Sequence, residues 1–152
     1  MIEYRYGCVA SALKLGEISV IAHQANCFNT MNSGVAKAIR QLYPEVYAAD
    51  CKTVKGDHKK LGGFTMSTTL DGLVFNLYGQ YDYGRGGKQY TDYEALRSSL
   101  KNMACKLRHL GFLGKIGIPK LGCGLGGGDW ESEVKLIVEQ TLGEWDVIVY
   151  EL

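Results

Sequence analysis

Residues 116–130, IGIPKLGCGLGGGDW, predict a strand, a glycine loop and the start of a helix in direct succession. The apolar run stops at Pro119, and five of the seven residues from Gly122 to Gly128 are glycine. Glycine lets backbone N–H groups approach a ligand closely, and the N-terminus of a helix favours negative charge. We therefore interpret this stretch as an anion or phosphate site; the alternative is a long turn that needs positive φ angles.

The chain has 152 residues, and we expect a single domain over residues 1–152 that is large enough to bury a sizeable core. Its 20 glycines and two prolines favour special loops in an ordered domain over a flexible linker. A net charge of +1 predicts little attraction to nucleic acid or to a membrane. Because we find neither a bilayer-length apolar run nor a signal peptide, we expect a cytoplasmic monomer.

Five cysteines occur, at positions 8, 27, 51, 105 and 123. Their number is odd and no two are closely spaced, which argues against a disulfide framework and against a zinc site. We expect most of them to be small, buried apolar side chains. We also expect no metal and no cofactor.

Hydrophobic periodicity and turn residues predict six strands and four helices. The strands are expected at 2–6, 18–22, 61–69, 73–79, 115–118 and 147–150. The helices are expected to begin at Ser33, Glu45, Asp92 and Asp129, the first two being separated by Pro44. Asp71-Gly72 predicts a hairpin turn between the third and fourth strands. Segments 13–17 and 55–60 are expected to be a connector and a surface loop.

The alternation of strands and helices predicts an α/β fold, a three-layer α/β/α sandwich whose hairpin makes the central sheet mixed. In such sheets ligands bind beyond the carboxyl ends of the strands. Three loops would meet there, at residues 26–34, 80–91 and 121–129, and all three are polar or rich in glycine. This edge is therefore the predicted site.

Polar residues follow the second predicted strand. Asn26 can donate and accept hydrogen bonds, as contact with a sugar hydroxyl requires, or it can simply cap a loop. His23 has a pKa suited to acid–base work, or it is a satisfied core residue. Its spacing places it on the opposite face from Asn26 unless the strand bends. Residues 32–34 open a helix and can offer N–H groups to an anion, or form an ordinary N-cap.

The loop from Gln80 to Thr91 carries rings and charges. Tyr81 and Tyr83 could stack on a ring of a ligand or cover the base of the loop. The cations of this loop could pair with phosphate or remain solvated; they are Arg85 and Lys88. The candidate acids are Asp82, Asp92 and Asp129. The last two of these already have a sufficient role as helix caps.

Residues 21–26, IAHQAN, and the SGVA sequence at 33–36 resemble the signature of the macro domain family. In that family a strand ends in Asn-Ala-Ala-Asn, and a glycine triplet followed by Val-Ala opens a helix. The sequence GCGLG at 122–126 resembles the second glycine loop of the family, again between a strand and a helix. The resemblance extends over essentially the whole chain, including the final strand at 147–150.

Macro domains bind ADP-ribose, so the resemblance implies an ADP-ribose site. Asn26 would contact the distal ribose, and residues 33–35 would lie by the diphosphate and that ribose. Residues 122–126 would wrap the diphosphate with backbone N–H groups, without a large positive patch. The implied ligand-binding residues are Cys8, Val9, Asn26, Ser33, Gly34, Val35, Gln80, Leu121, Gly122, Cys123, Gly124, Leu125 and Gly126.

Within the family, the chain is similar to the branch of yeast-type ADP-ribose 1″-phosphate phosphatases and the terminal ADP-ribose protein glycohydrolase. The shared features are His23, the Tyr93-Glu94 helix start, the Pro-x-Leu-Gly-Cys-Gly-Leu loop and Trp130. In the phosphatases, catalysis is assigned to a His at this position and a downstream Asp. The catalytic residues that this suggests are His23, Asn26 and Asp129.

Three positions depart from the family pattern. Many macro domains have an Asp near the first strand that holds the adenine amine, whereas here Gly7 is followed by Cys8. The glycohydrolase uses a Lys after its hairpin strand and an Asp directly after Gly-Leu. The corresponding residues here are Gln80 and Gly126, which disfavours a glycohydrolase of that mechanism.

The leading hypothesis is a macro domain that removes the phosphate from ADP-ribose 1″-phosphate. One alternative is a hydrolase that removes ADP-ribose from protein or nucleic acid, with a water positioned around Asn26. Another is a reader that binds ADP-ribose without chemistry. A module that binds nucleic acid alone is least favoured, because a net charge of +1 offers little counterion release.

Overall fold

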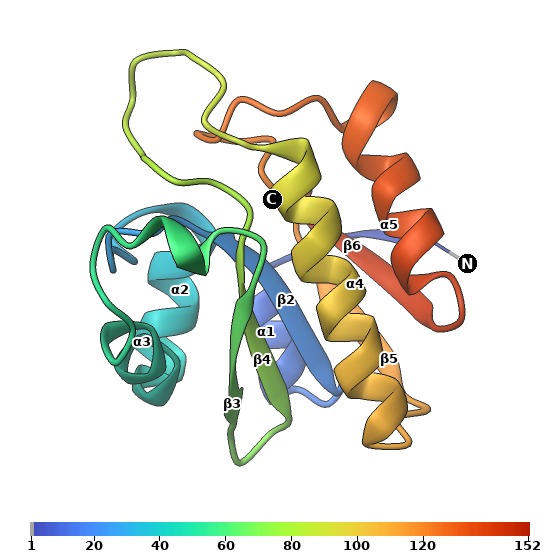
Figure 1. The fold of residues 1–152 in the computed structure, drawn as a ribbon. Helices are drawn as coiled ribbons and strands as arrows, with labels where there is room; N and C mark the ends of the chain where they lie inside the picture. Colours follow the sequence, from blue (N-terminus) through green and yellow to red (C-terminus); the bar gives the residue numbers. More distant parts are fainter. Residues whose placement is uncertain (1) are drawn as a thin grey trace.

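The computed structural model describes residues 2–152, which form a six-stranded sheet flanked by helices (Figure 1). The strands are β1 (Ile2–Tyr6), β2 (Val20–Ala25), β3 (Phe64–Thr68), β4 (Leu73–Tyr78), β5 (Lys115–Ile118) and β6 (Asp146–Glu151). Their order across the sheet is β1-β6-β5-β2-β4-β3. All neighbouring pairs are parallel except β3 and β4, which are antiparallel. The mixed sheet expected from the hairpin is confirmed.

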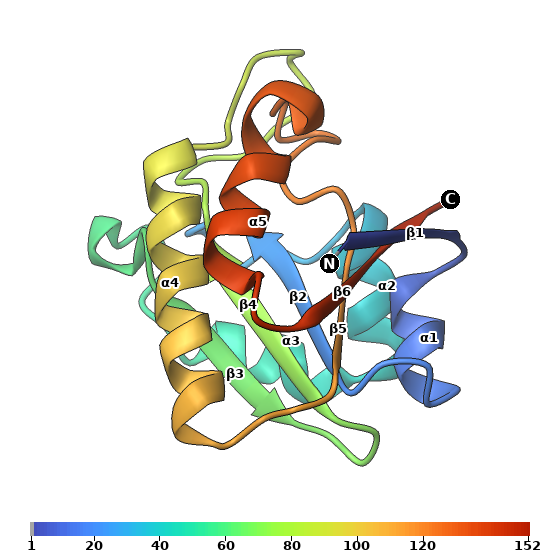
Figure 2. The same cartoon turned by 90° about the vertical axis from the view of Figure 1, so that its right-hand side faces the viewer.

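Helices cover both faces of this sheet, as the two perpendicular views show (Figures 1 and 2). One face packs against α4 (Tyr93–His109) and α5 (Lys135–Leu142). The other face packs against α1 (Val9–Lys14), α2 (Gly34–Leu42) and α3 (Pro44–Cys51). The three-layer α/β/α arrangement is therefore confirmed.

Each face of the sheet has its own apolar core, because successive side chains of a strand point to opposite faces. Val20 and Ala22 of β2 lie in the core under α4 and α5. Ile21, between them, lies in the core under α1, α2 and α3. Burial on both faces explains why the central strands are continuous apolar runs without a polar face.

The N-terminal part of the chain differs from prediction in two places. The helix α1 has only six residues, which is too short for helical periodicity to stand out, although Val9 and Leu13 are buried. The strand expected at 18–22 is shifted to Val20–Ala25, so that His23 and Gln24 lie within it. Two polar residues in succession suggested the end of the strand, whereas they are its continuation.

The last helix begins at the predicted cap but with a different turn. The Asp129 carboxylate accepts a hydrogen bond from the Ser132 N–H at 3.0 Å, and Asp92 caps α4 in the same way through Ala95. The first turn after Asp129, η2 (Trp130–Val134), is π-helical, and α5 continues from there. A short 3₁₀ helix, η1 (His58–Lys60), lies in the predicted surface loop at 55–60.

The carboxyl ends of the parallel strands lie at one edge of the sheet, the upper edge in Figure 1. The loops after β4 and β5 meet there, because the N–H groups of Tyr90 and Thr91 donate to the Gly126 carbonyl at 2.7 and 2.9 Å. Among residues 2–152, none of the helices combines the length and apolar character needed to cross a bilayer.

We predict that Gly72→Ala destabilises the fold by about 3 kcal/mol or more. Gly72, in the β3–β4 turn, has a φ of 147°, and an added Cβ would overlap the backbone carbonyl of Ser19. Gly16→Ala is the matched control, because Gly16 also has a positive φ, of 78°, but open space around its Cα. It should cost only about 1 kcal/mol. Urea unfolding measures the free energy of unfolding of both variants, and equal losses of stability would contradict the predicted clash at Gly72.

Candidate functional site

A cavity of about 540 Å³ lies at the carboxyl edge of the sheet, between the three loops that the sequence singled out. Its volume is within the range of small-molecule sites. The predicted site residues that line it are His23, Asn26, Ser33, Gly34, Val35, Gln80, Gly122, Gly124, Leu125 and Gly126. Asn32, Tyr83 and Arg85, which the sequence also raises as candidates, line it too. The lining residues that were not singled out are Gln24, Ala25, Thr30, Ala36, Gly84, Pro119, Lys120 and Leu152.

One wall of the cavity is the start of α2, residues 33–36. Ser33 is the N-cap, and Gly34 follows with a φ of 57°. The N–H groups of these four residues donate no hydrogen bond to any other described residue, as expected for the first turn of a helix. They therefore offer a set of neutral donors to an anion in the cavity.

The opposite wall is the loop after β5, residues 121–128. It is closed on itself by hydrogen bonds from Gly128 N to Gly122 O at 2.7 Å and from Gly127 N to Gly124 O at 3.1 Å. The N–H groups of residues 124–126 make no hydrogen bond within the described chain. Successive free N–H groups of this kind form an anion-binding concavity, so the cavity has backbone donors on two sides.

Thr91 holds this second wall in place. Its Oγ1 donates to the Gly122 carbonyl at 2.8 Å, and it accepts from Gln24 Nε2 at 2.9 Å. A Cβ on Gly122 would lie 2.5 Å from Thr91 Oγ1, and one on Gly126 would lie 2.6 Å from it. These two glycines are therefore required by the packing of the loop itself, in addition to any contact with a ligand.

Asn26 lies directly after β2 and is 8% exposed. Its Oδ1 accepts the Phe28 N–H at 2.8 Å, and its Nδ2 donates to Thr30 Oγ1 at 2.6 Å. The amide is fixed by these two bonds, yet it keeps one N–H and one lone pair for a ligand. Asn26 is thus a preorganised polar group at the floor of the cavity.

Lys60 supports the turn that follows Asn26 from below. Its Nζ donates to the Cys27 carbonyl at 2.9 Å and to Asn29 Oδ1 at 2.6 Å. Asn29 has a φ of 58°, a conformation that needs such support outside glycine. Nearby, the Tyr78 hydroxyl donates to the buried Asp50 carboxylate at 2.6 Å, and burial raises the pKa of Asp50.

His23 lines the cavity, but its side chain faces the core between β2 and α3. It is 1% exposed, and its Nε2 is hydrogen-bonded to the Asn76 Oδ1. Burial lowers the pKa of His23 to about 4, outweighing the hydrogen bond to Asn76, which raises it. The imidazole is therefore neutral at pH 7 and is not placed to donate a proton to a leaving group.

No Asp or Glu side chain among residues 2–152 lines the cavity. Asp129, predicted as catalytic, is exposed, lies outside the cavity lining and caps the last helix. Hydrogen bonding to the Ser132 N–H lowers its pKa. Asp82 and Asp92 lie outside the lining as well. Asp129 lies only three residues after Gly126 in the sequence, but its carboxylate caps the last helix and so is turned toward that helix.

Four residues predicted to bind the ligand do not line the cavity. Cys8 precedes α1 and packs beside Val9 in the core under α1, α2 and α3. Leu121 is fully buried under α4 and α5. Cys123 packs against that same core, and burial raises the pKa of its thiol to about 11. Leu121 and Cys123 turn toward the core while Gly122, Gly124, Leu125 and Gly126 line the cavity, so position along the glycine loop did not separate lining residues from packing residues.

The charged side chains that line the cavity are both cations, Arg85 and Lys120. Arg85 comes from the exposed loop after β4, whereas Lys120 is paired with Glu151 at 2.5 Å. With free N–H groups on two walls and no carboxylate on the lining, the cavity favours a ligand with negative charge. Within the described residues, no three His, Cys, Asp or Glu side chains meet as a metal site would require.

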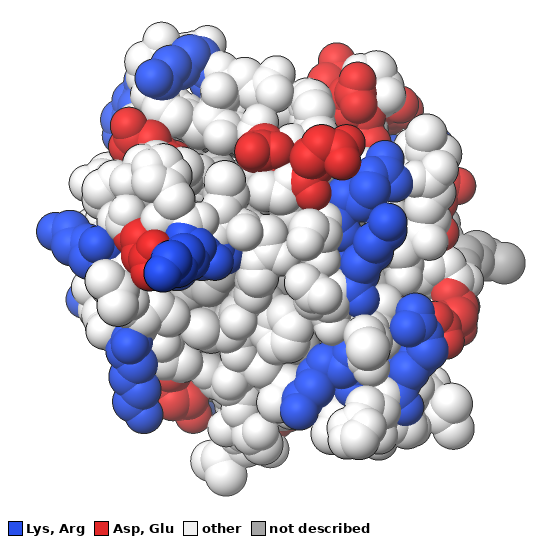
Figure 3. Space-filling model, in the orientation of Figure 1, with Lys and Arg blue, Asp and Glu red and all other residues white. Residues whose placement is uncertain are grey.

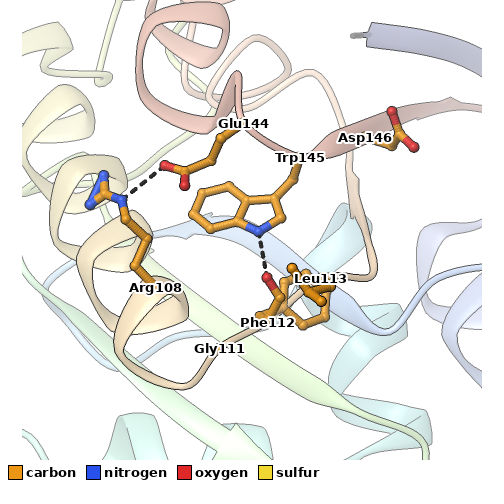
Figure 4. A pocket seen from close by; sticks show the side chains of 7 residues that line it. All are labelled: Arg108, Gly111, Phe112, Leu113, Glu144, Trp145 and Asp146. Carbon is orange, nitrogen blue, oxygen red and sulfur yellow. Dashed lines mark hydrogen bonds and ion pairs between the residues drawn. The ribbon is translucent and has the colours of Figure 1, made fainter.

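A second cavity, of about 320 Å³, lies around Trp145 beyond the C-terminal end of α4 (Figure 4). Arg108 Nε pairs with Glu144 at 2.9 Å beside it, and Trp145 Nε1 donates to the Phe112 carbonyl at 2.8 Å. These groups satisfy one another, and the cavity lies outside the three loops that the sequence predicts to form the site. We therefore take the first cavity as the candidate site.

We predict that Lys60→Met destabilises the protein by about 1–3 kcal/mol, because it removes two hydrogen bonds from an ammonium group to the turn after Asn26. Amide exchange of residues 27–30 should also become faster. Lys59→Met is the matched control, since Lys59 is exposed, and it should change the free energy of unfolding by less than about 0.5 kcal/mol. Equal effects of the two substitutions would contradict this role.

We also predict that His23 makes stability depend on pH. Its pKa is about 4 in the folded protein against an ordinary 6.5, so the unfolded chain takes up a proton first as the pH falls. The stabilisation is complete above pH 6.5 and is lost as the pH falls toward 4, by up to about 3 kcal/mol. Urea unfolding of wild type and His23→Gln should show this difference. An NMR titration in which the His23 imidazole signals change near pH 6.5 would contradict it.

Residues 22–137 match the sequence profile of the macro domain family. The chain is 34% identical over 140 residues to an uncharacterised 17.5 kDa protein of Enterobacteria phage T4, covering 86% of this chain and 84% of that protein. It is 27% identical to the DNA ADP-ribosyl glycohydrolase of Mycobacterium tuberculosis, covering 99% of this chain but 42% of that enzyme. It thus spans less than half of that relative.

Among solved structures, the fold matches the macrodomain of Thermus aquaticus DarG with a TM-score of 0.78 and 22% identity. The match covers 100% of this chain and 99% of that one. At this identity the likeness shows the fold alone, while the sequence profile shows the family. The sequence profile and the fold both match macro domains, and the chain belongs to the macro domain family.

Proposed function

We propose that the cavity binds ADP-ribose, with the diphosphate between the start of α2 and the loop after β5. The observation that carries this proposal is the pair of facing walls, residues 33–36 and 124–126, whose backbone N–H groups have no partner in the described chain. Backbone donors bind a diphosphate without the desolvation that a buried cation would require. Arg85 and Lys120 add positive charge at the cavity.

We propose further that the protein hydrolyses the bond between ADP-ribose and a macromolecule. In this reaction water adds to C1″ of the distal ribose while the bond from C1″ to the acceptor breaks, and the acceptor leaves with a proton. Asn26, fixed on the cavity floor by Phe28 and Thr30, is suited to hold that ribose and the attacking water. The relatives named DNA ADP-ribosyl glycohydrolase support this reaction type.

Hydrolysis also needs a group that accepts a proton from the attacking water, and neither Gln80 nor Gly126 can do so. Gln80 and Gly126 occupy the positions where the related protein glycohydrolase has its Lys and Asp, and no carboxylate of the described residues lines the cavity. The Gln80 amide is already used, accepting from Gln24 Nε2 and donating to the Asp82 carbonyl, both at 2.7 Å. A phosphate oxygen of the bound substrate would therefore have to take the proton from water, and turnover would be slow.

Removal of the phosphate from ADP-ribose 1″-phosphate is the second candidate, because His23 reaches the cavity lining. It would require His23 to protonate the leaving oxygen. Burial and a pKa of about 4 oppose that role. A reader without activity is the remaining possibility, and the lack of a lining carboxylate in the described chain favours it over the phosphatase.

We predict that Asn26→Ala lowers the rate of ADP-ribose release by about 100-fold or more, because it removes the group that orients ribose and water. The affinity for ADP-ribose should fall by less than about 10-fold, since the diphosphate contacts remain. Calorimetry with ADP-ribose and release of labelled ADP-ribose from modified protein and oligonucleotide measure the two effects. Asn32→Ala, a lining residue further from the floor, is the control.

The outcomes separate the three functions. Release of ADP-ribose without release of inorganic phosphate supports the glycohydrolase. Phosphate release from ADP-ribose 1″-phosphate that is lost in His23→Ala would instead establish the phosphatase. Micromolar binding of ADP-ribose with no turnover on any substrate would leave a reader, and absence of binding would overturn the whole proposal.

A further inference from the structure

A run of four rings leads from the mouth of the cavity onto the outer surface. Tyr83 lines the cavity, its ring centroid is 6.1 Å from that of Phe28, and Phe28 lies 4.9 Å from Tyr81. His58 stacks on Tyr81 at 3.6 Å with nearly parallel planes. These four residues, which we call the aromatic rim, join the loops after β2 and β4 to η1. The sequence marked Tyr81 and Tyr83, but the proposed reaction uses neither of them.

Two of the four rings pack the loops together, whereas the other two are exposed. Tyr81 and Phe28 are half-buried, and the Tyr81 hydroxyl donates to the Gly56 carbonyl at 2.7 Å. Tyr83, however, is 50% exposed at the cavity mouth, and His58 is exposed at the other end. The two ends thus offer open ring faces, one beside the ligand cavity and one beside η1. Open aromatic faces of this kind can stack on flat rings.

The surface around the rim is basic although the whole chain is nearly neutral. Segments 52–60 and 80–91 contain six Lys and Arg residues against two Asp, whereas the rest of the chain contains eleven against fourteen Asp and Glu. Figure 3 shows basic side chains over the loop after β4 at the upper left and along the left side, where the segment after α3 lies. The positive charge is therefore concentrated next to the aromatic rim.

A second basic column runs along α4, as Figure 3 also shows, and two of its cations are engaged by acceptors on α5 and on the turn after it. Arg108 pairs with Glu144 at 2.9 Å, and Arg97 is hydrogen-bonded to Gln140. The exposed cations by the rim, Lys55 and Lys59, have no side-chain ion pair among residues 2–152. Lys101 and Lys106 of α4 have no ion pair among residues 2–152 either, so the rim differs from α4 by the aromatic rings that lie beside its cations.

The rim also lies where an acceptor would leave the cavity. Phe28 donates its N–H to Asn26, the residue proposed to hold the distal ribose, so the rim begins two residues along the chain from Asn26. Tyr83, at one end of the rim, lines the same cavity as Asn26, so a macromolecule attached to a ribose at Asn26 would have the rim beside it. The chemistry of the rim should therefore match the chemistry of the acceptor.

We propose that the aromatic rim and the flanking cations bind the acceptor strand of an ADP-ribosylated single-stranded nucleic acid. Tyr83 and His58 would stack on bases, and Lys55, Lys59 and Arg85 would contact phosphates. Single strands are held by this combination of rings and cations, whereas a protein acceptor would not require a series of stacking faces. The inference rests on the proposed hydrolysis for its biological meaning, but the surface can be tested without it.

The test uses the whole protein and an unmodified, fluorescein-labelled 12-mer of thymidylate, read by anisotropy at low salt. Lys55→Glu/Lys59→Glu should weaken binding by about 10-fold or more and flatten the salt dependence. Tyr83→Ser should weaken it by about 5-fold or more through lost stacking. The matched control Lys101→Glu/Lys115→Glu makes the same charge change at exposed sites on and after α4, and it should stay within about twofold of wild type.

The result that would overturn the inference is equal loss in the rim variant and in the Lys101→Glu/Lys115→Glu control, or no binding of the 12-mer by wild type. Equal or tighter binding of polyglutamate would also overturn it in favour of an acidic polypeptide. Calorimetry with free ADP-ribose keeps the two proposals apart. Lys55→Glu/Lys59→Glu should bind ADP-ribose within about twofold of wild type, because neither residue lines the cavity. Failure of wild type to bind ADP-ribose would refute the proposed function and leave the rim standing.

Discussion

The close packing of Thr91 against the loop after β5 is the constraint on which the site depends. One hydroxyl ties the Gly122 carbonyl and the Gln24 amide together, at 2.8 and 2.9 Å. The loop can approach this closely only because Gly122 and Gly126 lack a Cβ. The carbonyls of Gly122, Gly124 and Gly126 are engaged, whereas the N–H groups of residues 124–126, which line the cavity, have no partner within the described chain. Thr91 and Gln24 thus convert a flexible glycine sequence into a fixed set of donors.

The molecule separates two kinds of recognition. Inside the cavity, partial charges on backbone N–H groups face the ligand, and such short-range contacts depend weakly on ionic strength. At the aromatic rim, whole charges on exposed Lys and Arg side chains lie in water, where salt screens them within about 10 Å. Binding of a small ligand and binding of a long acceptor should therefore respond differently to salt. A nearly neutral chain can carry out both, because its charge is unevenly distributed.

Most of the fold could be predicted from the sequence, because long amphipathic helices and buried strands have clear periodicities. The three loops of the site could be predicted as well, since glycine and Asn26 mark them. The helix α1 could not, because six residues are too few for a pattern. The partner of His23 is Asn76, 53 residues away, so its burial and lowered pKa are properties of the assembled sheet. The role of Asp129 as a helix cap could be predicted, because capping depends on neighbouring residues. Its position outside the cavity could not, because that depends on how the chain folds.

Gly126 shows how the shape of a loop restricts the chemistry that a protein can acquire. The terminal ADP-ribose protein glycohydrolase, which the sequence resembles, has an Asp at this place in the loop, and adding one here looks like a single substitution. A Cβ at Gly126 would lie 2.6 Å from Thr91 Oγ1 and 2.7 Å from the Gly122 carbonyl oxygen. Trimming Thr91 relieves the first overlap but not the second, which involves the backbone. A carboxylate at this position thus requires the loop backbone to shift as well, which a side-chain substitution at Thr91 alone does not supply.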